Sequence, residues 1–207
     1  MAHEAKPVPG LRLPTPTKKR VALLGNAGSI ASLSAHLGHN TYFKPESVLK
    51  LKENVLLIDI SGSMDSQVNG KRKIDIVREM LGIIEFDPRL WSYLVFSDNY
   101  HVLPTVKNLP DPNGGTQLHR PLEALKPTNP KQILVISDGM PDNASSCLKA
   151  ARNLSGVISV FYVGPEDDKI GREFLEKLAL ANRGKIIHVN LKQSLQHLAA
   201  GFRYLLR

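Results

Sequence analysis

Short apolar runs alternate with helix-period segments from residue 54 to the end of the 207-residue chain. The apolar runs are typical of strands that are buried on both faces of a sheet. They occupy residues 55–60, 132–137, 157–163 and 185–189. Between and after them, apolar residues recur at the spacing of amphipathic helices. The predicted helices occupy residues 73–86, 142 or 143 to 154, 171–181 and 191–206. This alternation predicts an α/β fold with a doubly wound, mostly parallel sheet and helices on both faces.

One segment departs from the alternation. Residues 91–97 and Tyr100–Leu103 are two strand-like runs that flank Asp98 and Asn99, a pair suited to a two-residue hairpin turn. We therefore expect one antiparallel strand at an edge of the sheet. Asp142 is the expected cap of the helix that follows it.

The start of the chain has a different composition. Pro7, Pro9, Pro14 and Pro16 prevent both a helix and a central strand there. Residues 1–53 contain 8 Lys and Arg against 3 Asp and Glu, net +5, whereas residues 54–207 contain 19 against 16, net +3, of the total +8. We expect residues 1–50 to form a basic, proline-containing arm or extension, and residues 51–207 to form the main domain.

Composition narrows the classes of protein that remain. No run of about 18 apolar residues is present, so we expect no membrane-spanning helix. Cys147 is the only cysteine, which excludes an intramolecular disulfide and a multi-cysteine zinc site and is compatible with a reducing cytoplasm. The net charge of +8 makes a polyanionic partner a possibility to consider.

The turn after the first apolar run carries the clearest candidate chemistry. Asp59, Ser61 and Ser63 occupy alternate positions, so they can direct three oxygens at one point, and Gly62 allows the tight bend between them. Oxygen ligands of this kind are preferred by hard divalent cations such as Mg²⁺. The turn therefore predicts a metal-dependent binding site.

Two further oxygen-bearing residues are expected at the same place. Asp59 and Asp138 each follow a buried strand, and strands on either side of a switch point bring such carboxylates together. Residues 110–115 are rich in turn formers, so this loop can carry Thr116 over the edge of the sheet. Asp59, Ser61, Ser63, Thr116 and Asp138 are thus the candidate metal residues.

With these motifs, residues 52 to 207 resemble a von Willebrand factor A (VWA) domain with a metal-ion-dependent adhesion site (MIDAS), of the Rossmann-like integrin I-domain type. The resemblance implies that Ser61 and Ser63 bind Mg²⁺ or Mn²⁺ directly and that Thr116 joins them when a ligand is bound. It implies that Asp59 and Asp138 act mainly through water. It also implies an open coordination position for an Asp or Glu of a partner protein. Stand-alone domains of this kind often serve multiprotein assemblies, including AAA+ ATPase partnerships.

Two other functions are open on the sequence alone. A Mg²⁺-dependent phosphoryl hydrolase of the haloacid-dehalogenase type needs a second acid where this chain has Ser61, and His119 at the rim is the only candidate base. A nucleic-acid-associated protein would use Arg12, Lys18, Lys19 and Arg20 of the arm as phosphate contacts. The hypothesis we carry forward is a cytoplasmic, divalent-metal-dependent protein-binding module without catalytic residues. In that module, the basic residues 71–73 near the metal turn are expected to favour an acidic partner surface.

Overall fold

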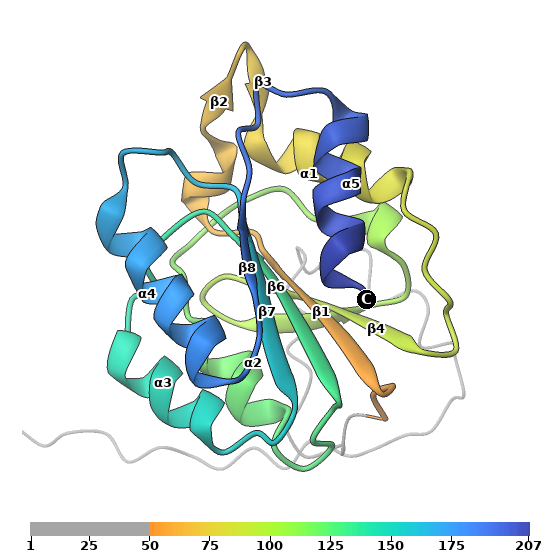
Figure 1. The fold of residues 1–207 in the computed structure, drawn as a ribbon, viewed down its shortest axis with the longest axis vertical. Coiled ribbons are helices and arrows are strands. Elements are labelled where there is room, and N and C mark those ends of the chain that lie inside the picture. Colours follow the sequence, from red (N-terminus) through yellow and green to blue (C-terminus); the bar gives the residue numbers. More distant parts are fainter. Residues whose placement is uncertain (1–49) are drawn as a thin grey trace, which may run out of the picture. The chain divides into compact units, whose positions relative to one another are not determined.

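The computed structural model describes residues 50–207, and the predicted arm, with its basic residues and prolines, lies outside this part of the chain apart from Lys50. The described residues form a six-stranded sheet of order β5-β4-β1-β6-β7-β8 (Figure 1). The strands are β1 (Asn54–Asp59), β4 (Trp91–Phe96), β5 (Tyr100–Leu103), β6 (Gln132–Ser137), β7 (Val157–Tyr162) and β8 (Ile186–His188).

All neighbouring strands in the sheet pair in parallel except β4 and β5, which are antiparallel. The predicted mixed sheet with one antiparallel edge strand is therefore confirmed. The hairpin turn is one residue longer than predicted, because Phe96 pairs with Tyr100 and leaves Ser97, Asp98 and Asn99 in the connection. The Asp98 side chain is held elsewhere, where it accepts a hydrogen bond from the Gly115 N–H at 2.9 Å.

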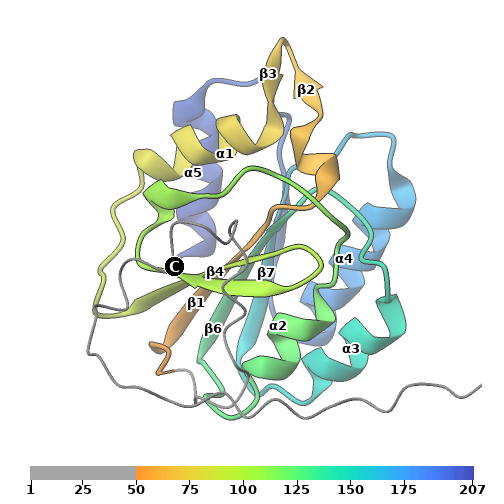
Figure 2. The same cartoon turned by 180° about the vertical axis from the view of Figure 1, so that it is seen from behind.

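Five helices cover the two faces of this sheet. They are α1 (Lys73–Gly82), α2 (His119–Ala124), α3 (Ala144–Arg152), α4 (Lys169–Ala181) and α5 (Leu195–Leu205). Helices α1 and α5 lie on one face, and α2, α3 and α4 lie on the other (Figures 1 and 2). No helix among the described residues has the length and apolar character needed to cross a membrane.

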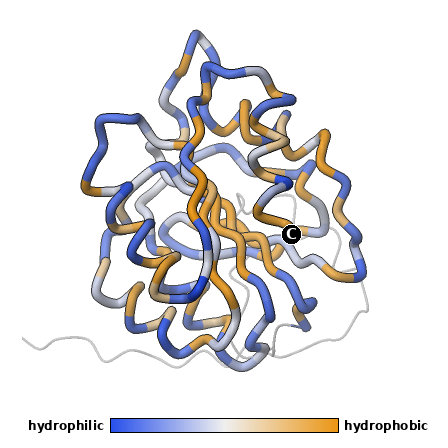
Figure 3. Tube along the Cα trace, viewed as in Figure 1, coloured by the Kyte–Doolittle hydropathy of each residue, from blue (hydrophilic) through white to orange (hydrophobic). Residues whose placement is uncertain are grey.

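Alternate residues of the central strands supply two separate cores. In β1, Leu56 and Ile58 pack with α1 and α5, whereas Val55 and Leu57 pack with the helices on the opposite face. Successive side chains of a strand point to opposite faces, so a strand covered on both faces must be apolar throughout. Figure 3 shows the resulting concentration of apolar residues along the middle of the sheet.

An aromatic cluster joins the C-terminal helix to the sheet. Phe86 lies edge to face against Trp91 and Tyr93, with ring centroids 5.6 Å apart in both pairs. It also contacts Phe202 of α5 at 6.1 Å, and Phe202 contacts Phe161 of β7 at 5.3 Å. The predicted helix to residue 86 is too long, since α1 ends at Gly82 and Phe86 belongs to the loop that reaches this cluster.

Three short elements lie between β1 and α1. A 3-10 helix (Gly62–Asp65) continues the turn after β1, and β2 (Gln67–Val68) and β3 (Lys71–Arg72) form a small hairpin that projects from the top of the domain (Figures 1 and 2). A second 3-10 helix (Val106–Asn108) follows β5. The sequence pattern did not predict β2, β3 or α2, because elements of two to six residues are too short to show a hydrophobic periodicity.

Candidate metal centre

The candidate site lies where the chain order reverses in the sheet. Strand β1 has β4 on one side and β6 on the other. After β1 the chain continues to β4 and β5 on one side of β1 and then crosses to β6 on the other side. Asp59 is the last residue of β1, and Asp138 follows directly after Ser137, the last residue of β6. Ligand sites of doubly wound sheets lie at such a point.

Four of the five predicted residues form one hydrogen-bonded cluster there. The backbone N–H of Ser61 donates to Asp59 Oδ1 at 2.8 Å, and the hydroxyls of Ser61 and Ser63 are 3.0 Å apart. The Ser63 hydroxyl donates to Asp138 Oδ1 at 2.7 Å. Asp59, Ser61 and Asp138 are buried, whereas Ser63 is exposed, so the cluster opens to solvent at Ser63.

The environment of Asp59 makes its negative charge costly. Burial, with the nearby Asp138 carboxylate as the second cause, raises the pKa of Asp59 from 3.8 to about 6, although hydrogen bonds from Ser137 and Ser61 act in the opposite direction. The Ser137 hydroxyl donates to Asp59 Oδ2 at 2.6 Å from the far side of the cluster. A positive charge near both carboxylates would relieve this cost.

The fifth predicted residue, Thr116, lies in a loop that pairs with the same turn. The Gly62 N–H donates to the Gly114 carbonyl at 3.0 Å, and the Asn113 N–H donates to the Ile60 carbonyl at 2.8 Å. The Thr116 backbone is bonded to Asp142 in both directions, by its N–H to Oδ2 at 3.0 Å and by its carbonyl to the Asp142 N–H at 3.1 Å.

This role for Asp142 corrects the expectation that it caps the following helix. The cap of α3 is Asn143, whose side chain accepts a hydrogen bond from the Ser146 N–H at 3.0 Å. The carboxylate of Asp142 instead accepts from Thr116 and from the Gln117 side chain. The structure therefore fixes the backbone of Thr116, while its half-buried hydroxyl makes no hydrogen bond to the described part of the chain.

A lysine that the sequence analysis did not place in the site lies directly behind it. Lys73 Nζ donates to Asp138 Oδ2 at 2.7 Å, and the two side chains are only 10% and 3% exposed. Lys73 is the first residue of α1. Lys73 is 65 positions from Asp138 in the chain, so the local pattern of the helix gives no indication of this contact.

The two preceding basic residues are also engaged within the domain. Lys71 pairs with Glu79. Arg72 binds three carboxylates, those of Asp65, Asp75 and Asp111. Each of the basic residues 71–73 therefore has an acidic partner within the domain, and whether they favour an acidic partner surface stays a prediction.

The donor set at this edge of the sheet fits a hard divalent cation. Within residues 50–207, no group of three His, Cys, Asp or Glu side chains could hold a metal ion. A metal at this point therefore needs the serine and threonine hydroxyls in addition to the carboxylates. Such an all-oxygen set suits Mg²⁺ or Mn²⁺ better than a softer ion.

The candidate base for a hydrolase, His119, has one buried ring nitrogen. His119 lies at the start of α2, and its Nδ1 atom is buried with no hydrogen-bond partner among the described residues. The Nδ1 atom is therefore not accessible as a base to a molecule bound at the solvent-exposed side of the cluster. Ser61, in the position of the second acid, bonds to Ser63.

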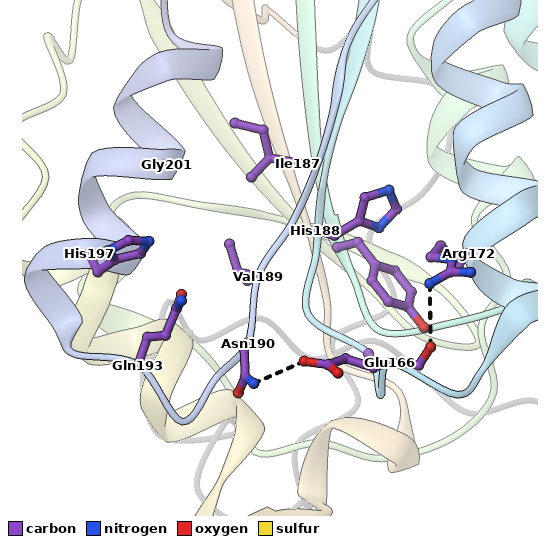
Figure 4. Close-up of a pocket in the computed structure, with 11 residues that line it drawn as sticks. Glu166, Arg172, Ile187, His188, Val189, Asn190, Gln193, His197 and Gly201 are labelled. Carbon is purple, nitrogen blue, oxygen red and sulfur yellow. Dashed lines mark hydrogen bonds between the residues drawn. The ribbon is translucent and has the colours of Figure 1, made fainter.

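A separate cavity of about 330 Å³ contains none of the predicted site residues. It lies between β8, the start of α5 and the start of α4, and it is lined by both polar and apolar side chains (Figure 4). Two hydrogen bonds join polar groups of its lining: Asn190 donates to the Glu166 carboxylate at 2.9 Å, and Arg172 donates to the Glu166 carbonyl at 3.3 Å. His188 lies edge to face against Tyr162.

The strand order, the antiparallel edge and the turn at the switch point define the fold as that of a VWA domain. The structure is similar to that of an aerotolerance-related membrane protein from Bacteroides fragilis, with a TM-score of 0.52 and 14% identity over 74% of this chain and 96% of that chain. At this identity the likeness shows the fold alone.

Two other solved structures are similar at lower scores. One is the manganese-loaded TRAP protein of Plasmodium vivax, with a TM-score of 0.49 and 14% identity over 74% of this chain and 72% of that one. The other is proximal thread matrix protein 1 from the mussel byssus with a zinc-occupied MIDAS motif, with a TM-score of 0.48 and 17% identity over 75% and 47%. No family model and no curated protein matches the chain.

Proposed function

We propose that this domain is a divalent-metal-dependent, adhesion-type module that binds a partner protein through an acidic residue of that partner. The observation that carries the proposal is the cluster in which two buried carboxylates and two serine hydroxyls converge at the switch point of the sheet. Asp59, Ser61, Ser63, Thr116 and Asp138 would hold Mg²⁺ or Mn²⁺. A bound ion would supply a positive charge to which a partner's Asp or Glu can bind.

The residues of the site have distinct tasks in this proposal. Asp59 and Asp138 are held from behind by Ser137 and Lys73, so their orientation does not depend on the ion. Ser61 and Ser63 supply neutral oxygens, which leave a cation with most of its charge. Thr116 sits on a loop whose backbone is fixed by Asp142, with its hydroxyl available as a further ligand.

Binding, rather than catalysis, accounts best for these residue types. The site has Ser61 where a second acid would be needed, and the Nδ1 atom of His119, the candidate base, is buried. The alternative nucleic-acid function rests on Arg12, Lys18, Lys19 and Arg20, which lie outside the described residues, so it stays a prediction. We keep a cytoplasmic multiprotein assembly, with an AAA+ ATPase as one type of partner, as the setting of the proposal.

Metal binding is tested by thermal unfolding with and without Mg²⁺. A ligand at 100 times its Kd stabilises the native state by about 2.7 kcal/mol, which raises the melting temperature. We expect Mg²⁺ to raise the melting temperature of the natural chain and of Ser145→Ala, a control at an exposed serine of α3. Asp59→Ala and Ser61→Ala should lose the increase. An increase of equal size in both site variants would contradict the proposed site.

Partner binding is tested by affinity purification in Mg²⁺, in EDTA and at raised salt. A partner that is lost on chelation and kept in salt supports a metal bridge to a carboxylate. A partner that is lost only in salt indicates contacts of the basic arm with phosphates or acids, since salt screens such exposed charges.

A further inference from the structure

We infer that the Lys73 ammonium serves as a resident cation of this site, which competes with the divalent metal for Asp138 and keeps the metal affinity of the unpartnered domain low. The inference rests on the proposed metal site and concerns its regulation. It is carried by the position, burial and partners of one side chain.

Lys73 is connected to the candidate ligands through a single carboxylate. Its Nζ atom lies 2.7 Å from Asp138 Oδ2, and the Ser63 hydroxyl lies 2.7 Å from Oδ1 of the same group. Ser63 in turn lies 3.0 Å from the Ser61 hydroxyl. A cation that approaches these hydroxyls therefore approaches a carboxylate whose charge Lys73 already neutralises.

The charge of Lys73 has no other described acidic partner. Asp75, on the same helix, is bound by Arg72 and Arg78. Lys71 is bound by Glu79. A buried ammonium without its carboxylate would be strongly destabilising, so Lys73 retains its claim on Asp138 and a bound metal has to share this carboxylate with it.

The sum of charges sets the expected effect. Asp59 and Asp138 contribute two negative charges and Lys73 one positive charge, so the protein offers a divalent ion a net charge of −1 instead of −2. Repulsion between the ammonium and the ion lowers metal affinity, and the loaded site keeps a net positive charge that favours an anionic partner group. By linkage, a partner carboxylate and the metal should then strengthen the binding of each other.

The test compares Mn²⁺ binding by the full chain and two matched variants, measured by titration calorimetry. K73M removes the buried charge and keeps an aliphatic side chain of similar length. K71M removes the same charge two positions away, where the side chain is 45% exposed and bound to Glu79. We expect K73M to bind Mn²⁺ at least about tenfold more tightly than the natural chain, and K71M to bind within about twofold.

A second variant guards against failure of K73M to fold. In K73Q the amide can still donate to Asp138 without a positive charge, and the same direction of change is expected. A second readout is the melting temperature. In EDTA, K73M should melt below the natural chain because Asp138 is left without its counter-charge, and Mn²⁺ should raise the melting temperature of K73M more than that of the natural chain.

The outcomes separate this inference from the proposed function. If the natural chain binds Mn²⁺ and both Lys73 variants bind it equally well or more weakly, the inference alone is overturned. Lys73 then forms an ion pair with a structural role only. Binding by the Lys73 variants alone supports the inference and contradicts metal loading of the natural chain. Absence of binding by every protein overturns the metal site and the inference together.

Discussion

Ser137→Ala should destabilise the domain in a way that depends on pH. The Ser137 hydroxyl donates to Asp59 Oδ2 at 2.6 Å, and both side chains are buried. Burial raises the pKa of Asp59 to about 6, so this carboxyl is ionised at pH 8 and mostly protonated at pH 5. A hydrogen bond to a charged group contributes about 1.5–3 kcal/mol, against about 0.5–1.5 kcal/mol for a neutral one. The cost of the substitution should therefore fall by about 1 kcal/mol from pH 8 to pH 5.

The sign of the underlying linkage is fixed by the direction of the pKa shift. The native state holds the Asp59 proton more tightly than the unfolded chain, whose ordinary value is 3.8. The stabilisation from this proton is complete below pH 3.8 and is lost as the pH rises through about 6. At about 1.36 kcal/mol per pKa unit, the difference corresponds to about 3 kcal/mol at most. Removing Ser137 raises the pKa further, so more stability is lost at pH 8.

The assay is urea unfolding in EDTA at pH 8 and pH 5. Ser159→Ala is the matched control, because Ser159 is a buried serine of β7 whose hydroxyl accepts a neutral hydrogen bond from the Lys185 N–H at 3.2 Å. Its cost should be the same at both pH values. A pH-independent cost for Ser137→Ala, or one at pH 8 no larger than that of Ser159→Ala, would refute the reasoning about Asp59.

Three further predictions concern the packing of the domain. Burial raises the pKa of the Cys147 thiol to about 12, so labelling of the native protein by a thiol reagent at pH 8 should be more than about a hundredfold slower than in urea. Phe202→Ala should cost about 3–5 kcal/mol of the free energy of unfolding, because the ring is fully buried in the aromatic cluster. Gly184→Ala should cost more than about 1 kcal/mol, since an added Cβ would overlap the backbone of β7, whereas Gly82→Ala, with open space around it, should be nearly neutral or stabilising.

The sequence was informative where local pattern and tertiary position agree. The run before Asp59 is apolar at every position because β1 is covered on both faces, so its strand was predictable. The end of a buried strand also predicts where a carboxylate lies, so the sequence predicts that Asp59 and Asp138 lie at the same edge of the sheet. Whether these residues bind a metal stays a prediction.

Residues with distant partners were not predictable in the same way. Lys73 begins an amphipathic helix, a position at which a lysine is usually solvated, but here it is buried in an ion pair with Asp138, the residue after β6. Asp142 is of a residue type that often caps helices, yet its carboxylate accepts a hydrogen bond from the Thr116 N–H instead. In both cases a tertiary contact decided between local choices of similar free energy.

The aromatic cluster gives the protein an intrinsic spectroscopic probe. Trp91 is the only tryptophan of the chain, and Phe86 contacts both its ring and that of Phe202 in α5. Trp91 pairs with Asn54 at the start of β1, at the opposite end of that strand from Asp59. Fluorescence emission of Trp91 would thus report a displacement of the C-terminal helix during a titration with metal or partner, without any label near the site itself.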